Sequence, residues 1–217
     1  MIVLVALIGL FIGVVLVWAS DFLPRYSEGL RSRSVTIPAH LTMTSRLHFC
    51  AFLLSAVACL FFYGRYGLSV ALVFNASIFS FLLLIALIDL KYRLVLNILT
   101  YPAFVIVVLA QLLFPQQGAL RILLGGGLAF GIFFLTARLK PGDLGGGDVK
   151  LATLIGLFFG FPGVLWALIV GAGTGALVAI VLLVTHRDGS KRFFPYAPFL
   201  CGGAIVALLY SPVLLTR

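Results

Sequence analysis

The stretch LSVALVFNASIFSFLLLIALID, residues 68–89, decides the fold class of this chain. It carries no charged side chain until its last residue, Asp89. An α-helix rises about 1.5 Å per residue, so a run of this length can cross the roughly 30 Å hydrocarbon core of a bilayer. The stretch therefore predicts a transmembrane helix.

The rest of the chain follows the same pattern. Of its 217 residues, 63% are hydrophobic and only 10% are charged, and the mean hydropathy is +1.23. Soluble domains are usually about 25% charged. We therefore predict an all-α polytopic membrane protein with about eight transmembrane helices. The predicted spans are residues 2–19, 47–63, 68–89, 97–114, 120–138, 149–161, 164–185 and 196–213.

These spans predict a single transmembrane domain over residues 1–217, with a short cytoplasmic loop at about 20–46. That loop contains Pro24, Gly29 and Pro38 and lacks helical periodicity. No Lys or Arg precedes Arg25. A secretory signal begins with a basic segment, so the first span is interpreted as a retained transmembrane helix.

The positive charge supports this topology. The net charge is +9, and 12 of the 15 Lys and Arg residues fall in one set of loops if the N-terminus lies outside. Basic residues accumulate in cytoplasmic loops. An even number of spans then places both the N- and C-termini on the non-cytoplasmic side. The excess charge thus indicates topology and contact with membrane lipid rather than binding of nucleic acid.

Two carboxylates lie at the predicted cytoplasmic edge, among only six Asp and Glu residues. Asp89 ends the third span, and Asp148 precedes the sixth. The simpler interpretation is an interfacial Asp89 paired with Lys91 or Arg93, and an Asp148 favoured by the helix dipole. The functional interpretation is a dyad that shares one proton. Such a pair can activate water and protonate a leaving amine.

Glycines precede one of these acids in the segment PGDLGGGDVK, residues 141–150. Gly145, Gly146 and Gly147 remove side-chain bulk, so an extended peptide can approach Asp148. No GxxxxGK[ST] motif is present, which argues against phosphate binding. Asp143 is a rival for Asp148, but Pro141-Gly142 indicates a turn there. The sixth span is short and stops before Pro162-Gly163, so it is either a helix that continues through the proline or a short helix that faces a cavity.

Cysteine and histidine add no predicted site. Cys50, Cys59 and Cys201 lie in apolar segments without a CxxC pair, and are interpreted as packing residues. His40, His48 and His186 lack partners at metal-ligand spacing, and are interpreted as loop or interfacial residues. We therefore predict neither a metal nor a cofactor.

Three blocks of sequence resemble one family. GGGDVKLATLIGLFFG, residues 145–160, contains the GxGD signature of intramembrane aspartic proteases and resembles the second block of type IV prepilin peptidases. IDLKYRLVLNILTYP, residues 88–102, resembles their first block, and FPYAPFLCGG, residues 194–203, resembles their PFGPFL stretch.

This resemblance implies an aspartyl endopeptidase of the bacterial cytoplasmic membrane. Such enzymes remove the basic leader of prepilins or pseudopilins, cutting after a glycine at the cytoplasmic face. Asp89 and Asp148 match the two catalytic aspartates. Gly145, Gly146, Gly147 and Lys150 match the residues around the second one, and we assign them substrate binding or loop shaping. Glu28 is our first candidate for binding the basic leader.

The chain departs from the family pattern at three places. The region between the first two spans lacks the two CxxC pairs that many members carry, so neither N-methylation nor S-adenosylmethionine is implied. Asn97 replaces a frequent acid of the first block, and Ala197 replaces the glycine of PFGPFL.

Two other functions remain open at this point. Acids near a broken membrane helix also suit an ion-coupled transporter, although both acids lie at one face. A substrate-binding component of a pilus or secretion machine is the second. Within the protease hypothesis, helix dipoles favour the anion at Asp148 and the protonated form at Asp89.

Overall fold

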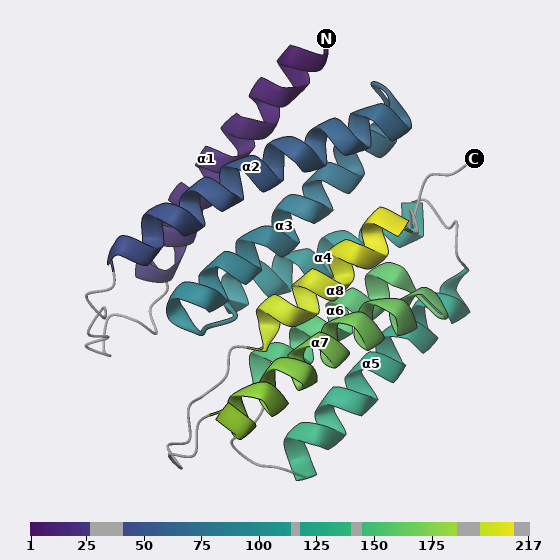
Figure 1. The fold of residues 1–217 in the computed structure, drawn as a ribbon. Coiled ribbons are helices and arrows are strands. Elements are labelled where there is room, and N and C mark those ends of the chain that lie inside the picture. Colours follow the sequence, from purple (N-terminus) through teal and green to yellow (C-terminus); the bar gives the residue numbers. More distant parts are fainter. Residues whose placement is uncertain (27–40, 114–117, 140–144, 186–195, 211–217) are drawn as a thin grey trace. The chain divides into compact units, whose positions relative to one another are not determined.

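The computed structural model describes residues 1–26, 41–113, 118–139, 145–185 and 196–210. These residues form eight α-helices (Figure 1). In chain order they are α1 (Ile2–Tyr26), α2 (Leu41–Tyr66), α3 (Val70–Tyr92), α4 (Asn97–Leu113), α5 (Ala119–Leu139), α6 (Gly146–Phe159), α7 (Gly163–Thr185) and α8 (Ala197–Tyr210). The all-helical class is therefore confirmed for the described residues, and each predicted span coincides with one helix.

Five of these helices are long and apolar enough to cross a membrane: α1, α2, α3, α5 and α7. Many of their large apolar side chains are exposed, such as Phe11, Trp18 and Leu135. Exposed apolar surface on this scale suits a lipid environment. The helices α4, α6 and α8 are shorter, and the membrane crossing of these three stays a prediction, as does the side on which the termini lie.

The predicted loop at 20–46 is wrong at both ends. The helix α1 continues to Tyr26, and α2 begins at Leu41. Hydropathy marks where the apolar run stops, whereas a helix can continue beyond it once its polar side chains reach water. Pro24 near the end of α1 lacks only one backbone donor. Glu28, His40, Asp143 and His186 lie outside the described residues, so their predicted roles are untested.

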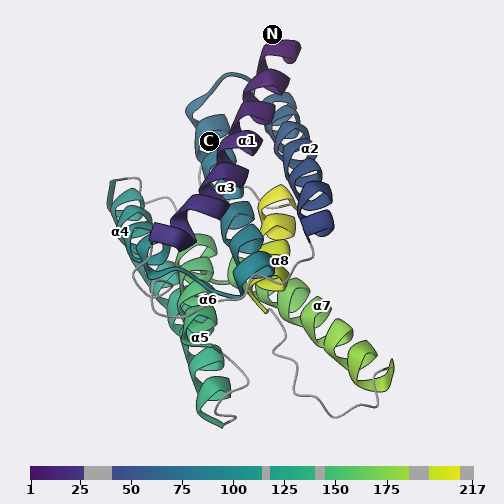
Figure 2. The same cartoon turned by 90° about the vertical axis from the view of Figure 1, so that its left-hand side faces the viewer.

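The described chain divides into two compact units, Met1–Ile88 and Asp89–Arg217. In the first unit, α1 lies along α2 (Figures 1 and 2). Gly9 and Gly13 permit this contact, since a Cβ atom at either would lie within 2.9 Å of the α2 backbone at Ala56 or Phe52. Small residues allow membrane helices to approach closely in this way.

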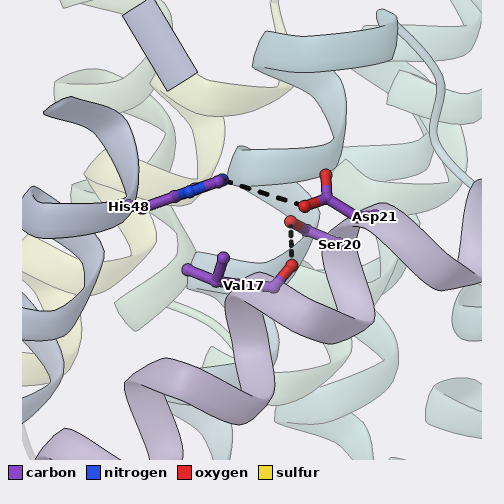
Figure 3. A network of polar contacts seen from close by, with 4 residues as sticks. All are labelled: Val17, Ser20, Asp21 and His48. Atoms are coloured by element: carbon purple, nitrogen blue, oxygen red, sulfur yellow. Dashed lines mark hydrogen bonds and ion pairs between the residues drawn. The ribbon is translucent and has the colours of Figure 1, made fainter. Parts of the chain in front are cut away.

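A polar pair joins the same two helices (Figure 3). His48 Nε2 of α2 lies 3.8 Å from Asp21 Oδ2 of α1. One residue earlier, the Ser20 hydroxyl donates to the Val17 carbonyl at 2.8 Å. The predicted interfacial His48 thus faces an acid from the neighbouring helix.

In the second unit, α6 is the central element. It contacts α4, α5, α7 and α8, and Leu151 and Ala152 are fully buried. Gly125 of α5 and Gly156 of α6 meet backbone to backbone, so neither position has room for a Cβ atom. The break after the sixth predicted span is confirmed, because α6 ends at Phe159 and Gly160 takes a φ of +60°.

The cysteines differ in their surroundings. Cys59 and Cys201 are buried, as packing residues would be, whereas Cys50 is exposed on α2. The packing interpretation is therefore wrong for Cys50. This helix also presents Phe49, Leu53 and Leu54 to the outside, so a small apolar residue suits a face that points away from the protein.

Candidate active site

Asp89 lies in the last turn of α3, at the start of the second unit. Its side chain is only 5% exposed. The Arg93 N–H donates to the Asp89 carbonyl at 2.8 Å, and Arg93 adopts a φ of +53°, so the chain turns sharply away after the helix. The apolar run of α3 thus delivers a carboxyl group to a buried position in the last turn of the helix.

Asp148 occupies the opposite kind of helix end, the first turn of α6. Gly145 is the residue that precedes the helix, and its N–H donates to Asp148 Oδ2 at 3.3 Å. In return, the Asp148 N–H donates to the Gly145 carbonyl at 3.0 Å. An acid at this position accepts from free backbone donors and lies at the positive end of the helix dipole.

The second unit brings these two acids together. Their carboxyl groups are close enough to interact electrostatically, and Arg93 interacts with Asp89 as well. The Asp89 carboxylate also accepts a hydrogen bond from the backbone N–H of Ala197, the first residue of α8. Its Oδ2 is buried and has no hydrogen-bond partner among the described residues. The two carboxyl groups that the sequence singled out therefore share one site.

The N-terminus of α8 contributes residues that the sequence analysis did not assign to the site. Tyr196 interacts electrostatically with Asp148, and Cys201 does so with both aspartates. Cys201 is fully buried, and the Tyr196 ring lies 5.9 Å from that of Phe133. The only sequence signal for Tyr196 and Cys201 was the block FPYAPFLCGG, residues 194–203. Ala197 serves in place of glycine because the site uses its backbone N–H, which both residues have.

The three glycines before Asp148 differ in their surroundings. A Cβ atom on Gly147 would lie 2.7 Å from Val95 Cβ, so this glycine is required by packing. Gly146 is exposed and has nothing within 4 Å of that position. A Cβ atom on Gly145 would lie 3.4 Å from Asp148 Oδ2. The loop therefore leaves one edge of Asp148 open at Gly145 and Gly146.

Lys150 reaches across to α4. Its Nζ donates to Asn97 Oδ1 at 2.8 Å and to the Tyr101 hydroxyl at 3.0 Å. The same ammonium lies 4.7 Å from the centre of the Tyr101 ring, a distance typical of a cation–π contact. Asn97, which stands where a carboxylate is frequent in the first block, is thus the partner of Lys150.

Two interacting carboxyl groups can perform acid–base chemistry on a water molecule and an amide. Like charges at close range disfavour double ionisation, so one group tends to hold a proton. Across the described part of the chain, no group of three His, Cys, Asp or Glu side chains is arranged to hold a metal ion. Two such carboxyl groups offer general acid–base chemistry, in which one accepts a proton from a reacting group and the other donates one.

Comparison with known proteins gives two matches. The model of the type IV leader peptidase family matches residues 76–182, which include both aspartates. The prepilin leader peptidase/N-methyltransferase of Bacillus subtilis (strain 168) is 31% identical over 157 residues. That match covers 71% of this chain and 63% of the relative. No solved structure gives a significant match. Neither comparison supports the transporter hypothesis.

Proposed function

Because the chain belongs to the type IV leader peptidase family, we propose that it is a membrane-embedded aspartyl endopeptidase. Its substrates are type IV prepilins or pseudopilins, and it removes their leader peptide after a glycine at the cytoplasmic face of the bacterial membrane. The observation that carries this proposal is that the buried Asp89 and the half-buried Asp148 lie close enough to interact electrostatically. N-methylation is outside the proposal.

The dyad performs hydrolysis by moving protons in two directions. The ionised carboxylate takes a proton from water as the water oxygen attacks the scissile carbonyl, and the protonated carboxyl gives its proton to the carbonyl oxygen. Collapse of the tetrahedral intermediate breaks the C–N bond. The proton taken from water passes to the leaving amine, and one hydroxyl of the intermediate returns a proton to the carboxylate that had protonated the carbonyl oxygen. Asp148 is the ionised member, because it lies at a helix N-terminus, and Asp89 is the protonated one.

Each carboxyl group accepts one backbone N–H, so the division rests on the two helix ends. The Gly145 N–H donates to Asp148, which stabilises a carboxylate. The Ala197 N–H holds one oxygen of Asp89 while Oδ2 remains without a protein partner. That oxygen is where the shared proton and the attacking water would be held. Gly145 and Gly146 leave room beside Asp148 for an extended substrate, whereas Gly147 and Lys150 lie within α6 and contact α4 and the segment that leads into it.

The test is cleavage of a prepilin-like peptide by the protein in detergent or liposomes. Asp89→Asn and Asp148→Asn should each lower kcat by roughly 100- to 10,000-fold, the usual share of general acid–base catalysis. Asp21→Asn is the matched control, since Asp21 pairs with His48 in the other unit, and it should cleave at the wild-type rate. Full activity in either dyad variant would refute the two-aspartate mechanism.

A further inference from the structure

Lys150 and Asp148 are two residues apart in α6 and therefore point to different sides of the helix. Asp148 interacts with Asp89, whereas the Lys150 ammonium is bound by Asn97 and Tyr101 of α4. These two partners are four residues apart, which places them on one face of α4. An amide oxygen and a phenol oxygen thus accept two of the three hydrogen bonds that Lys150 can donate. Its role is separate from proton transfer in the dyad.

A second contact lies on the same face of α6. Gly147 is three residues before Lys150, and its Cα is so close to Val95 that a Cβ atom would lie 2.7 Å from Val95 Cβ. Val95 belongs to the short connection between α3 and α4. The first turn of α6 is therefore held at two points by one continuous segment, Val95–Tyr101. We refer to Val95, Asn97, Tyr101, Gly147 and Lys150 as the α4–α6 bracket.

The bracket connects the two aspartates by a short path. Asp89 ends α3, and its carbonyl accepts from the Arg93 N–H. Two residues later Val95 contacts Gly147, which is bonded directly to Asp148. A shift of Val95–Tyr101 against α6 would therefore change the separation of the two carboxyl groups. Misplacement of reacting groups by about 1 Å can cost roughly a hundredfold in rate.

We propose that the α4–α6 bracket sets the distance between Asp89 and Asp148, and that Lys150 is a positioning residue for the dyad through its bonds to Asn97 and Tyr101. This inference rests on the proposed peptidase function. It gives Asn97 a specific task, which is to accept the hydrogen bond that Lys150 donates.

The experiment measures kcat and KM for prepilin-like peptide cleavage in matched variants. Lys150→Met keeps the length and apolar stem but removes both donated bonds, and should lower kcat by about tenfold to a hundredfold with KM nearly unchanged. Arg138→Met removes a charge from the exposed end of α5 and should leave both constants at the wild-type value. Wild-type kcat in Lys150→Met, or a loss confined to KM, overturns the inference.

A double-mutant cycle separates the bond from general destabilisation. Lys150→Met and Asn97→Leu should each lower kcat, and the double variant should lose little more than the larger single loss, because both remove the same contact. Asn97→Asp keeps an acceptor and should lose far less than Asn97→Leu. Fully additive losses would overturn the bracket.

The same cycle on thermal unfolding does not depend on activity. The double variant Lys150→Met with Asn97→Leu should lower Tm by less than the sum of the two single-variant decreases. If the wild-type protein cleaves no prepilin-like peptide, the proposed function fails, while coupled Tm shifts still support the contact. If the wild-type protein cleaves and the variants show no coupling in kcat or Tm, the bracket fails and the function stands.

Discussion

The two aspartates occupy opposite kinds of helix end, and they also differ in how far the surrounding protein covers them. Asp89 lies at the C-terminus of α3, is 5% exposed, and has one buried oxygen without a partner in the described protein. Asp148 lies at the N-terminus of α6, is half-buried, and accepts from an exposed glycine. Packed residues enclose Asp89, whereas Asp148 borders Gly145, Gly146 and Gly147, which have no side chains. We therefore expect a substrate to approach from the Asp148 side.

This asymmetry also bears on ionisation. A helix C-terminus disfavours an anion and an N-terminus favours one, so the enclosed acid is the better proton holder. The dyad still titrates as a coupled unit. The test is the titration of the remaining acid in Asp89→Asn and in Asp148→Asn. If the remaining acid titrates identically in both variants, the two acids do not differ in ionisation.

The largest expected difference between the two acids is in the loss of kcat when each side chain is lengthened by one methylene group. Asp89→Glu adds volume to a side chain that is only 5% exposed, and its carboxyl group must move away from the Ala197 N–H, so kcat should fall by about a hundredfold. In Asp148→Glu the longer side chain can extend past Gly145 and Gly146, so kcat should fall by only about tenfold. The measurement is kcat for peptide cleavage. Equal losses would contradict the enclosed-against-open comparison.

The glycine loop allows a sharper test of the open side. Gly147→Ala must displace Val95 and should destabilise the protein by about 1–3 kcal/mol, the usual cost of overpacking. Gly146→Ala meets nothing within 4 Å and should leave the unfolding temperature unchanged. Thermal unfolding in detergent checks this pair. A similar loss of stability in both variants would show that Gly146 is as enclosed as Gly147.

The sequence predicted the helices well because they depend on local signals, and it singled out two aspartates that the structure places within electrostatic reach of each other. Apolar runs of membrane length placed the helices, and most of their ends are correct to within about three residues. The loop at 20–46 was too long, since Asp21 and Pro24 end an apolar run without ending α1. The aspartates were identified as acids beside long apolar segments, which are costly unless they are functional.

The partners of those acids depend on packing between distant segments. Ala197 contributes a backbone N–H, which leaves no residue-type signal, and Cys201 looks like any small apolar residue of a membrane helix. The bond from Lys150 to Asn97 spans 53 positions. Composition and spacing cannot indicate such a pair before the packing of α4 against α6 is known.

The smallest expected effect concerns the donor that the enclosed acid receives from α8. Ala197→Pro removes the backbone N–H that Asp89 accepts, while proline is tolerated at the first position of a helix. Because Asp89 is the protonated acid, loss of this one hydrogen bond costs about 0.5–1.5 kcal/mol, so kcat should fall by up to about tenfold. Ala197→Gly keeps the donor and should lose much less. If Ala197→Pro retains the wild-type kcat, the α8 N-terminus does not hold Asp89, and its burial alone must account for the difference between the two acids.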